Sequence, residues 1–105
     1  MCKTSIYEAI FSAVCAETEI SREQIESNTK QADVVEARSL LFHYLHRAGF
    51  YPAQIARMTG HSRQSVNVQL QSFCNRCQFG GNIIKIYKQR LDRLLAEYLL
   101  PPPLA

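Results

Sequence analysis

The sequence predicts an all-α protein, a compact bundle of about six helices, from three observations. Apolar residues recur at the three- and four-residue spacing of a helix face along most of the chain. Glycines that can end helices separate these segments, at Gly49, Gly60 and positions 80–81. No segment alternates apolar and polar residues as a half-buried strand does, and there is no repeat or low-complexity tract.

Length and composition fit one globular domain over residues 1–105. The chain is 47% hydrophobic and 20% charged, which is ordinary for a folded protein and unlike a disordered tail. No apolar run approaches the roughly 18 residues of a membrane span, and residues 1–16 lack a signal-peptide pattern. We therefore expect a soluble, cytoplasmic protein without a membrane partner.

Capping signals divide the first half of the chain into three helices. Ser5 with Glu8 can form a capping box at the start of the first helix, and Ser21 with Gln24 can form another before a short helix containing Ile25. Residues 27–32 are polar and predict a loop. The first helix should turn inward Ile6, Tyr7, Ile10, Phe11 and Val14.

A longer helix should follow and form the spine of the core. Asp33 and Glu36 can cap its start, and Gly49 can end it. Its inner face should carry Val34, Ala37, Leu41, Tyr44, Leu45 and Ala48.

Residues 52–78 predict a helix-turn-helix. Pro52 suits a first helical position, where its missing N–H costs nothing. Gly60 can end this helix in the left-handed conformation, at a bend that we expect a Cβ would obstruct. Ser62 can cap the second helix. The residues expected to turn inward are Ile55, Ala56, Val66, Leu70, Phe73 and Cys77.

A last amphipathic helix is expected from Asn82, its predicted cap, to the region before Pro101, with residues 101–105 as a tail. Its inner face should carry Ile83, Ile84, Tyr87, Leu91, Leu94, Leu95 and Tyr98. Its outer face should carry Lys85, Lys88, Arg90 and Arg93.

The cysteines and histidines do not form a recognisable metal or catalytic site. Cys74 and Cys77 have the CxxC spacing, but Cys2 and Cys15 supply no matching second pair. We interpret Cys74 or Cys77 as a small apolar core residue and the other cysteines as surface thiols. There is no defensible Ser, His and Asp grouping and no glycine-rich phosphate loop. We expect neither a metal, a cofactor nor an enzymatic activity.

Charge is distributed unevenly along the chain. Residues 1–36 hold three basic and seven acidic side chains, a net charge of −4. Residues 37–105 hold nine basic and two acidic side chains, a net charge of +7. The asymmetry indicates either a polyanionic partner for the basic part or simply solvated helix faces. The helix-turn-helix pattern favours nucleic acid.

The second helix of a helix-turn-helix presents its first turn to base edges in the DNA major groove. Arg63, Gln64 and Asn67 are the side chains expected to point outward there. Arg pairs bidentately with guanine, and Gln or Asn with adenine. The alternative is that they form a solvated polar face.

The flanks of the motif should hold the DNA backbone. Ser62, Ser65 and Arg57 suit phosphate contacts. His61 lies in the turn, where it can either pack with its imidazole hydrogen-bonded or reach a phosphate, and we expect the phosphate contact.

The order of these segments, over residues 6–98, resembles the C-terminal DNA-binding domain of the bacterial replication initiator DnaA, in the Trp-repressor-like helix-turn-helix group. The shared features are an N-terminal helix, a polar loop, a terminal amphipathic helix and the motif residues Ile20, Ser21, Glu23, Ile25, the VVEAR segment 34–38, Pro52, Ile55, Ala56, Gly60, Ser65 and Val66. The resemblance implies that Lys30 and Arg38 contact the DNA backbone on the loop side. It also implies that Arg63, Gln64 and Ser65 lie on the side of the domain that reads the bases.

Two departures from that family imply a different DNA target. The family's basic pair near the long helix is here Glu36 with Arg38. Its Gly-Arg-Asp-His-Thr-Thr-Val signature is here Gly-His-Ser-Arg-Gln-Ser-Val, at residues 60–66. We therefore expect a stand-alone, sequence-specific double-stranded DNA-binding protein that acts in replication or transcription control, as a monomer or a homodimer. The alternative is a helical protein-interaction module that has lost DNA binding and contacts its partner through the acidic N-terminal third.

Overall fold

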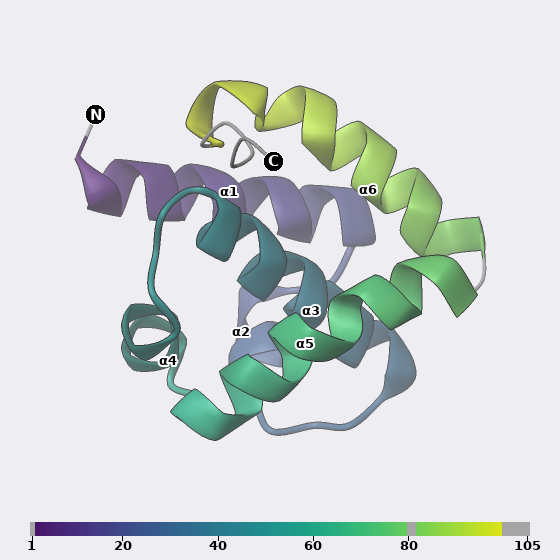
Figure 1. Ribbon diagram of the computed structural model, residues 1–105, viewed down its shortest axis with the longest axis horizontal. Coiled ribbons are helices and arrows are strands. Elements are labelled where there is room, and N and C mark those ends of the chain that lie inside the picture. Colours follow the sequence, from purple (N-terminus) through teal and green to yellow (C-terminus); the bar gives the residue numbers. More distant parts are fainter. Residues whose placement is uncertain (1, 80–81, 100–105) are drawn as a thin grey trace.

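Local start and stop signals set most of the helix boundaries in the computed structural model, which describes residues 2–79 and 82–99 (Figure 1). The elements are α1 Lys3–Thr18, α2 Arg22–Glu26, α3 Ala32–Arg47, α4 Pro52–Thr59, α5 Arg63–Phe79, α6 Asn82–Leu94 and the short 3-10 helix η1 Ala96–Tyr98. The described part of the chain contains no strand, so the all-α prediction is confirmed. The predicted break at 80–81, the tail at 101–105 and the side chains of Cys74 and Asn82 lie outside what the structure describes.

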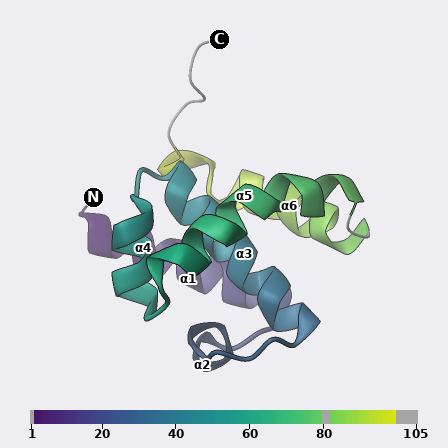
Figure 2. The same ribbon diagram turned by 60° about the horizontal axis from the view of Figure 1, so that its bottom comes forward.

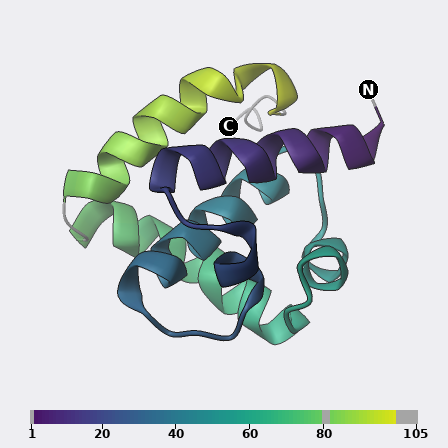
Figure 3. The ribbon, with the colours of Figure 1, turned by 180° about the vertical axis from the view of Figure 1, so that it is seen from behind.

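Helix α3 occupies the middle of the molecule. Helix α5 crosses it on one side (Figure 1), and α1 covers it on the other, with α6 beside α1 (Figure 3). Because α3 is covered on two sides, it buries more than one stripe. Leu40 and Phe42 are fully buried in addition to the predicted Val34, Ala37, Leu41, Tyr44 and Leu45, whereas the predicted Ala48 is only partly buried.

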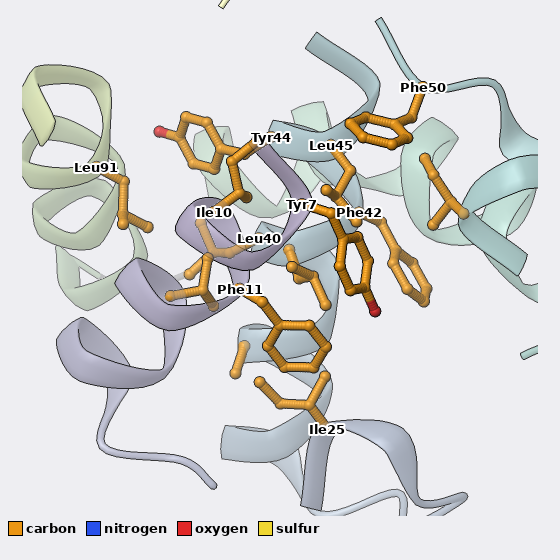
Figure 4. Close-up of a cluster of buried hydrophobic side chains, with 14 of the residues drawn as sticks. Tyr7, Ile10, Phe11, Ile25, Leu40, Phe42, Tyr44, Leu45, Phe50 and Leu91 are labelled. Atoms are coloured by element: carbon orange, nitrogen blue, oxygen red, sulfur yellow. The ribbon is translucent and has the colours of Figure 1, made fainter. Parts of the chain in front are cut away.

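One continuous apolar cluster joins the six helices. In the close-up of Figure 4, Ile10 and Phe11 of α1 lie against Leu40 of α3, with Ile25 of α2 below them. Each fully buried aliphatic or aromatic side chain contributes about 1.5–3 kcal/mol relative to an exposed one. All five residues predicted for the inner face of the first helix belong to this cluster or pack against it.

The start of α1 differs from the prediction. The helix begins at Lys3, with Cys2 at its N-cap and no side-chain capping bond, so the capping box of Ser5 with Glu8 was wrong. The Glu8 carboxylate instead accepts two bonds from Arg22, at 2.6 and 3.1 Å. The second predicted box is confirmed, because the Ser21 hydroxyl accepts from the Gln24 N–H and the Gln24 side-chain oxygen accepts from the Ser21 N–H.

Helix α6 packs through a narrower stripe than predicted. Ile84, Leu91 and Leu95 are buried, but Ile83 and Leu94 are 52% and 56% exposed, which corrects their assignment to the inner face. The reason is that α6 contacts mainly α1, so only one row of its side chains reaches the core.

Arg38 ties α3 to the segment that follows α2. Its Nε donates to the Ile25 carbonyl at 3.0 Å, Nη1 to the Thr29 carbonyl at 3.2 Å and Nη2 to the Ser27 carbonyl at 2.7 Å. The residue is only 5% exposed. We call this group of bonds the Arg38 clamp. It satisfies one carbonyl in the last turn of α2 and two in the segment between α2 and α3, where the helices supply no N–H for them.

His43 lies between α3 and α5 in a neutral state. Its ring stacks on Phe73, with centroids 4.0 Å apart, and its buried Nε2 has no hydrogen-bond partner among the described residues. Burial lowers the pKa of His43 to about 4, and the nearby cations Arg47 and Lys88 act in the same direction. Between about pH 4 and 6.5, His43 is therefore protonated in the unfolded chain but not in the folded protein.

We predict that Arg38→Met destabilises the protein by about 3 kcal/mol, because it leaves the carbonyls of Ser27 and Thr29 without their donor and removes one of two donors from the Ile25 carbonyl. Urea unfolding of the variant measures this loss. Arg93→Met removes an exposed arginine of α6 and is the matched control, with an expected change within about 0.5 kcal/mol. Equal stability of the two variants would show that the clamp contributes nothing.

We predict that stability falls as the pH is lowered from about 6.5 to 4, because only the unfolded chain binds a proton at His43 in that range. The contribution of this group is on the order of 3 kcal/mol. His43→Phe keeps the stacked ring and should remove this component, whereas His46→Gln, at an exposed position, should keep most of it, because His46 lowers the pKa of His43 less than burial, Arg47 or Lys88 does. Urea midpoints measured at several pH values test this, and parallel profiles for His43→Phe and wild type would contradict it.

Candidate nucleic-acid interface

The connection between α4 and α5 is short and follows the expected local signals. Gly60 adopts the left-handed conformation, with φ of 76°, and its N–H donates to the Ala56 carbonyl at 3.0 Å. The Ser62 hydroxyl accepts from the Ser65 N–H at 3.1 Å, and α5 begins at Arg63. Pro52 is the first residue of α4. The turn at residues 60–62 thus fixes where α5 starts.

The predicted steric obstruction of a Cβ at Gly60 is wrong. A Cβ built at this position would have no heavy atom within 4 Å, so no neighbour obstructs it. The positive φ alone favours glycine, because an L side chain in the left-handed region clashes with its own backbone.

The same turn separates an inward from an outward set of side chains. Ile55, Ala56 and Val66 are buried. Arg63 and Gln64, in the first turn of α5, are exposed. Asn67, one turn later, is half-buried, and Val68 is 55% exposed.

His61 packs against the core. Its Nε2 lies 3.0 Å from the Ile25 carbonyl and must carry the proton of this bond, because a carbonyl only accepts. Its ring meets Phe42 edge-on, with centroids 5.7 Å apart. This is the packing alternative, and it makes Nε2 unavailable to the phosphate that we expected His61 to reach.

The cations expected to contact the DNA backbone divide into two groups. Arg38 is mostly buried and donates three bonds in the clamp, so little of its side chain is left for the DNA backbone contact that the resemblance implied. Lys30, in the loop after α2, and Arg57, on α4, are exposed, and neither forms an ion pair with a described residue. The Ser62 hydroxyl is exposed, and Ser65 is half-buried.

A pocket of about 430 Å³ is lined by residues of the first half of α5, of α3 and of the loop that follows α2. Figure 2 shows the loop between α2 and α3 at the end of the molecule where α2 lies. Its polar lining includes Lys30 and Arg38, and Ser65 and Gln69 of α5. Gln69 was not among the predicted site residues, although its position four residues after Ser65 places the two on one face of α5. No local pattern indicates that the loop would approach that face.

The acidic side chains of the N-terminal third are partly neutralised within the fold. Arg22 pairs with Glu8 at 2.6 Å and with Glu26 at 3.8 Å, and Arg90 pairs with Glu17 at 3.5 Å. By contrast, Arg63 forms no ion pair with any described residue. The uncompensated positive charge of the α4–α5 connection is therefore available to an anionic partner.

Comparison with protein-family models, with curated proteins and with solved structures gives no match for this chain. Among the described residues, no three His, Cys, Asp or Glu side chains gather as a metal site would require. None of the helices described is both long and apolar enough to cross a membrane.

We predict that Gly60→Ala destabilises the protein by about 1 kcal/mol, since the added Cβ is strained only by the backbone conformation. Gly60→Asn should cost less, because Asn adopts the left-handed region more readily. Thermal or urea unfolding gives the ranking. A loss in Gly60→Ala several-fold larger would instead indicate a steric clash.

Proposed function

We propose that the protein binds double-stranded DNA with sequence preference, through the first turn of α5. The observation that carries this proposal is the α4–α5 connection. It exposes Arg63 and Gln64 at a helix N-terminus while Ile55 and Val66 anchor both helices to the core. A rigid helix end bearing long polar side chains suits insertion into a major groove.

The side chains at this end have the chemistry of base recognition. Arg63 can donate two bonds to guanine O6 and N7, and Gln64 or Asn67 can pair with adenine N6 and N7. Each such pair discriminates against a wrong base by about 1–3 kcal/mol. The helix N-terminus adds unpaired backbone N–H groups that favour a phosphate.

Exposed groups on both flanks suit contacts to the two DNA backbones. Arg57 lies on α4 and Lys30 in the loop after α2, with the hydroxyls of Ser62 and Ser65 between them. Phosphate contacts of this kind set the register of the helix in the groove, whereas the base contacts set the preference.

The resemblance to the initiator's DNA-binding domain supports the same proposal and suggests a cytoplasmic protein of replication or transcription control that is not an enzyme. The altered turn, with His61 and Arg63, supports a target other than the initiator's. His61 adds to this difference, because its imidazole is held by the Ile25 carbonyl.

A protein-interaction module is the second candidate. It is favoured by the exposed apolar side chains of α6, namely Ile83, Ile86 and Leu94, which are 52%, 46% and 56% exposed. A complex with a protein that is insensitive to salt, together with no retardation of duplex DNA, would support this candidate.

We predict that the protein selects a preferred sequence from a pool of random duplexes and that its affinity falls steeply with salt, because phosphate contacts release counterions. Arg63→Ala should lower the preference at one base position by about 1–3 kcal/mol. Fluorescence anisotropy with the selected and a scrambled duplex measures both effects.

Arg93→Ala is the control for a lost positive charge, since Arg93 is an exposed arginine on α6. It should leave the sequence preference unchanged. If Arg63→Ala keeps both the affinity and the preference of the wild type, α5 is not the reading helix. If no duplex binds at low salt, the protein does not recognise DNA.

A further inference from the structure

A hollow of about 270 Å³ lies where the start of α1 meets α4, and we call it the α1–α4 hollow. It is lined by Lys3, Phe50, Gln54, Arg57 and Met58. The two cations are exposed, and neither forms an ion pair with a described residue. No carboxylate is among the lining residues. Positive charges that share one hollow without a counterion create a potential that attracts an anion.

The fold positions the Lys3 ammonium before any ligand binds. It lies 5.3 Å from the centroid of the Phe50 ring, which is only 2% exposed and is held in place by the core. The side-chain oxygen of Gln54 accepts from Lys3 Nζ at 3.5 Å and from the Tyr51 N–H at 2.9 Å. Gln54 and Arg57 are three residues apart and share one face of α4. Two segments far apart in the sequence therefore form one cationic surface.

This surface lies on one flank of the helix end that is proposed to read DNA. In Figures 1 and 2, α4 and the loop between α2 and α3 lie on opposite sides of the start of α5. When the second helix of a helix-turn-helix enters a major groove, its first helix crosses a DNA backbone. The backbone that crosses α4 therefore meets the α1–α4 hollow, and the loop that carries Lys30 faces the other strand.

We infer that the α1–α4 hollow holds the DNA backbone beside the bases that α5 reads, with Lys3 and Arg57 on one phosphate or on neighbouring ones. The inference rests on the proposed DNA binding. It adds α1 to the interface, a helix to which neither the helix-turn-helix pattern nor the resemblance assigns a contact. Phosphate contacts carry no sequence information directly. Lys3 therefore contributes to affinity for every duplex and not to the preference among duplexes.

An acidic segment of a protein is the alternative anion for this surface. The DNA backbone is favoured because α4 carries half of the hollow and joins α5 through the short turn at residues 60–62. A duplex that reaches Arg63 and Gln64 thus has to pass close to α4.

The test is the salt dependence of binding to the duplex selected from a random pool, measured by fluorescence anisotropy. Each phosphate contact contributes about 0.9 to the slope of log affinity against log salt concentration. Lys3→Gln should lower the slope by about one and weaken binding about fivefold at low salt, equally for the selected and a scrambled duplex. The double variant with Arg57→Gln should lower the slope by about two.

Two further variants are the controls. Lys3→Arg keeps the positive charge and should retain the wild-type slope. Lys85→Gln removes an exposed lysine of α6 and should change neither the slope nor the affinity. Because Lys3 is exposed, all these variants should keep the wild-type midpoint of urea unfolding.

Duplexes with a single uncharged methylphosphonate in place of a backbone phosphate identify the phosphate that Lys3 contacts. At that position the replacement should weaken wild-type binding about fivefold and leave the affinity of Lys3→Gln unchanged, because both changes remove the same contact. At phosphates that Lys3 does not contact, the two losses should add.

The inference is overturned if the selected duplex is bound with its preference while Lys3→Gln and the double variant keep the wild-type slope and affinity. The proposed function then stands, and the hollow is left to an acidic protein segment. A loss in Lys3→Gln that is confined to the selected duplex also overturns it, because Lys3 would then contact a base. If no duplex binds at low salt, the proposed function and the inference fail together.

Discussion

The carbonyl oxygen of Ile25 accepts hydrogen bonds from two distant side chains, Arg38 and His61. Ile25 lies near the end of α2, a five-residue helix whose last carbonyls have no partner within the helix. From Ser27 the backbone is extended, and the Arg38 guanidinium collects the carbonyls of Ser27 and Thr29 as well. A buried cation at a helix C-terminus is also favoured by the helix dipole, which offsets part of its desolvation. This one contact point joins α2, α3 and the α4–α5 turn.

The proposed binding surfaces depend on that point. His61 holds the turn from which α5 starts, so the backbone position of the first turn of α5, which carries Arg63 and Gln64, is set before any partner binds. The Arg38 clamp holds the loop that carries Lys30 against α3, and the pocket lies between this loop and α5. Surfaces that are ordered in advance lose less conformational entropy on binding. A loop and a helix from distant parts of the sequence thus present one polar face.

Polar atoms are also buried where α3 and α5 meet. His43 Nε2, Gln69 Oε1 and Arg76 Nε have no partner among the described residues. Burial of the His43 ring disfavours the charged imidazolium and therefore lowers the pKa of this group. Stacking on Phe73 retains the apolar contribution of the ring. Polar atoms buried without a partner lower the free energy of unfolding, so these three atoms offset part of what the packing contributes.

The sequence by itself determined the all-α class and most helix boundaries, because these depend on contacts within about four residues. Ser21, Pro52 and Ser62 act at the helix starts that their neighbours predict, and Gly60 ends α4. Only the tertiary structure decided that Arg38 is buried, that His61 packs inward and that α5 forms a pocket with the loop at Lys30. Each of these depends on partners that lie 9 to 36 residues away or on the packing of several helices. Such contacts leave no local pattern in the chain.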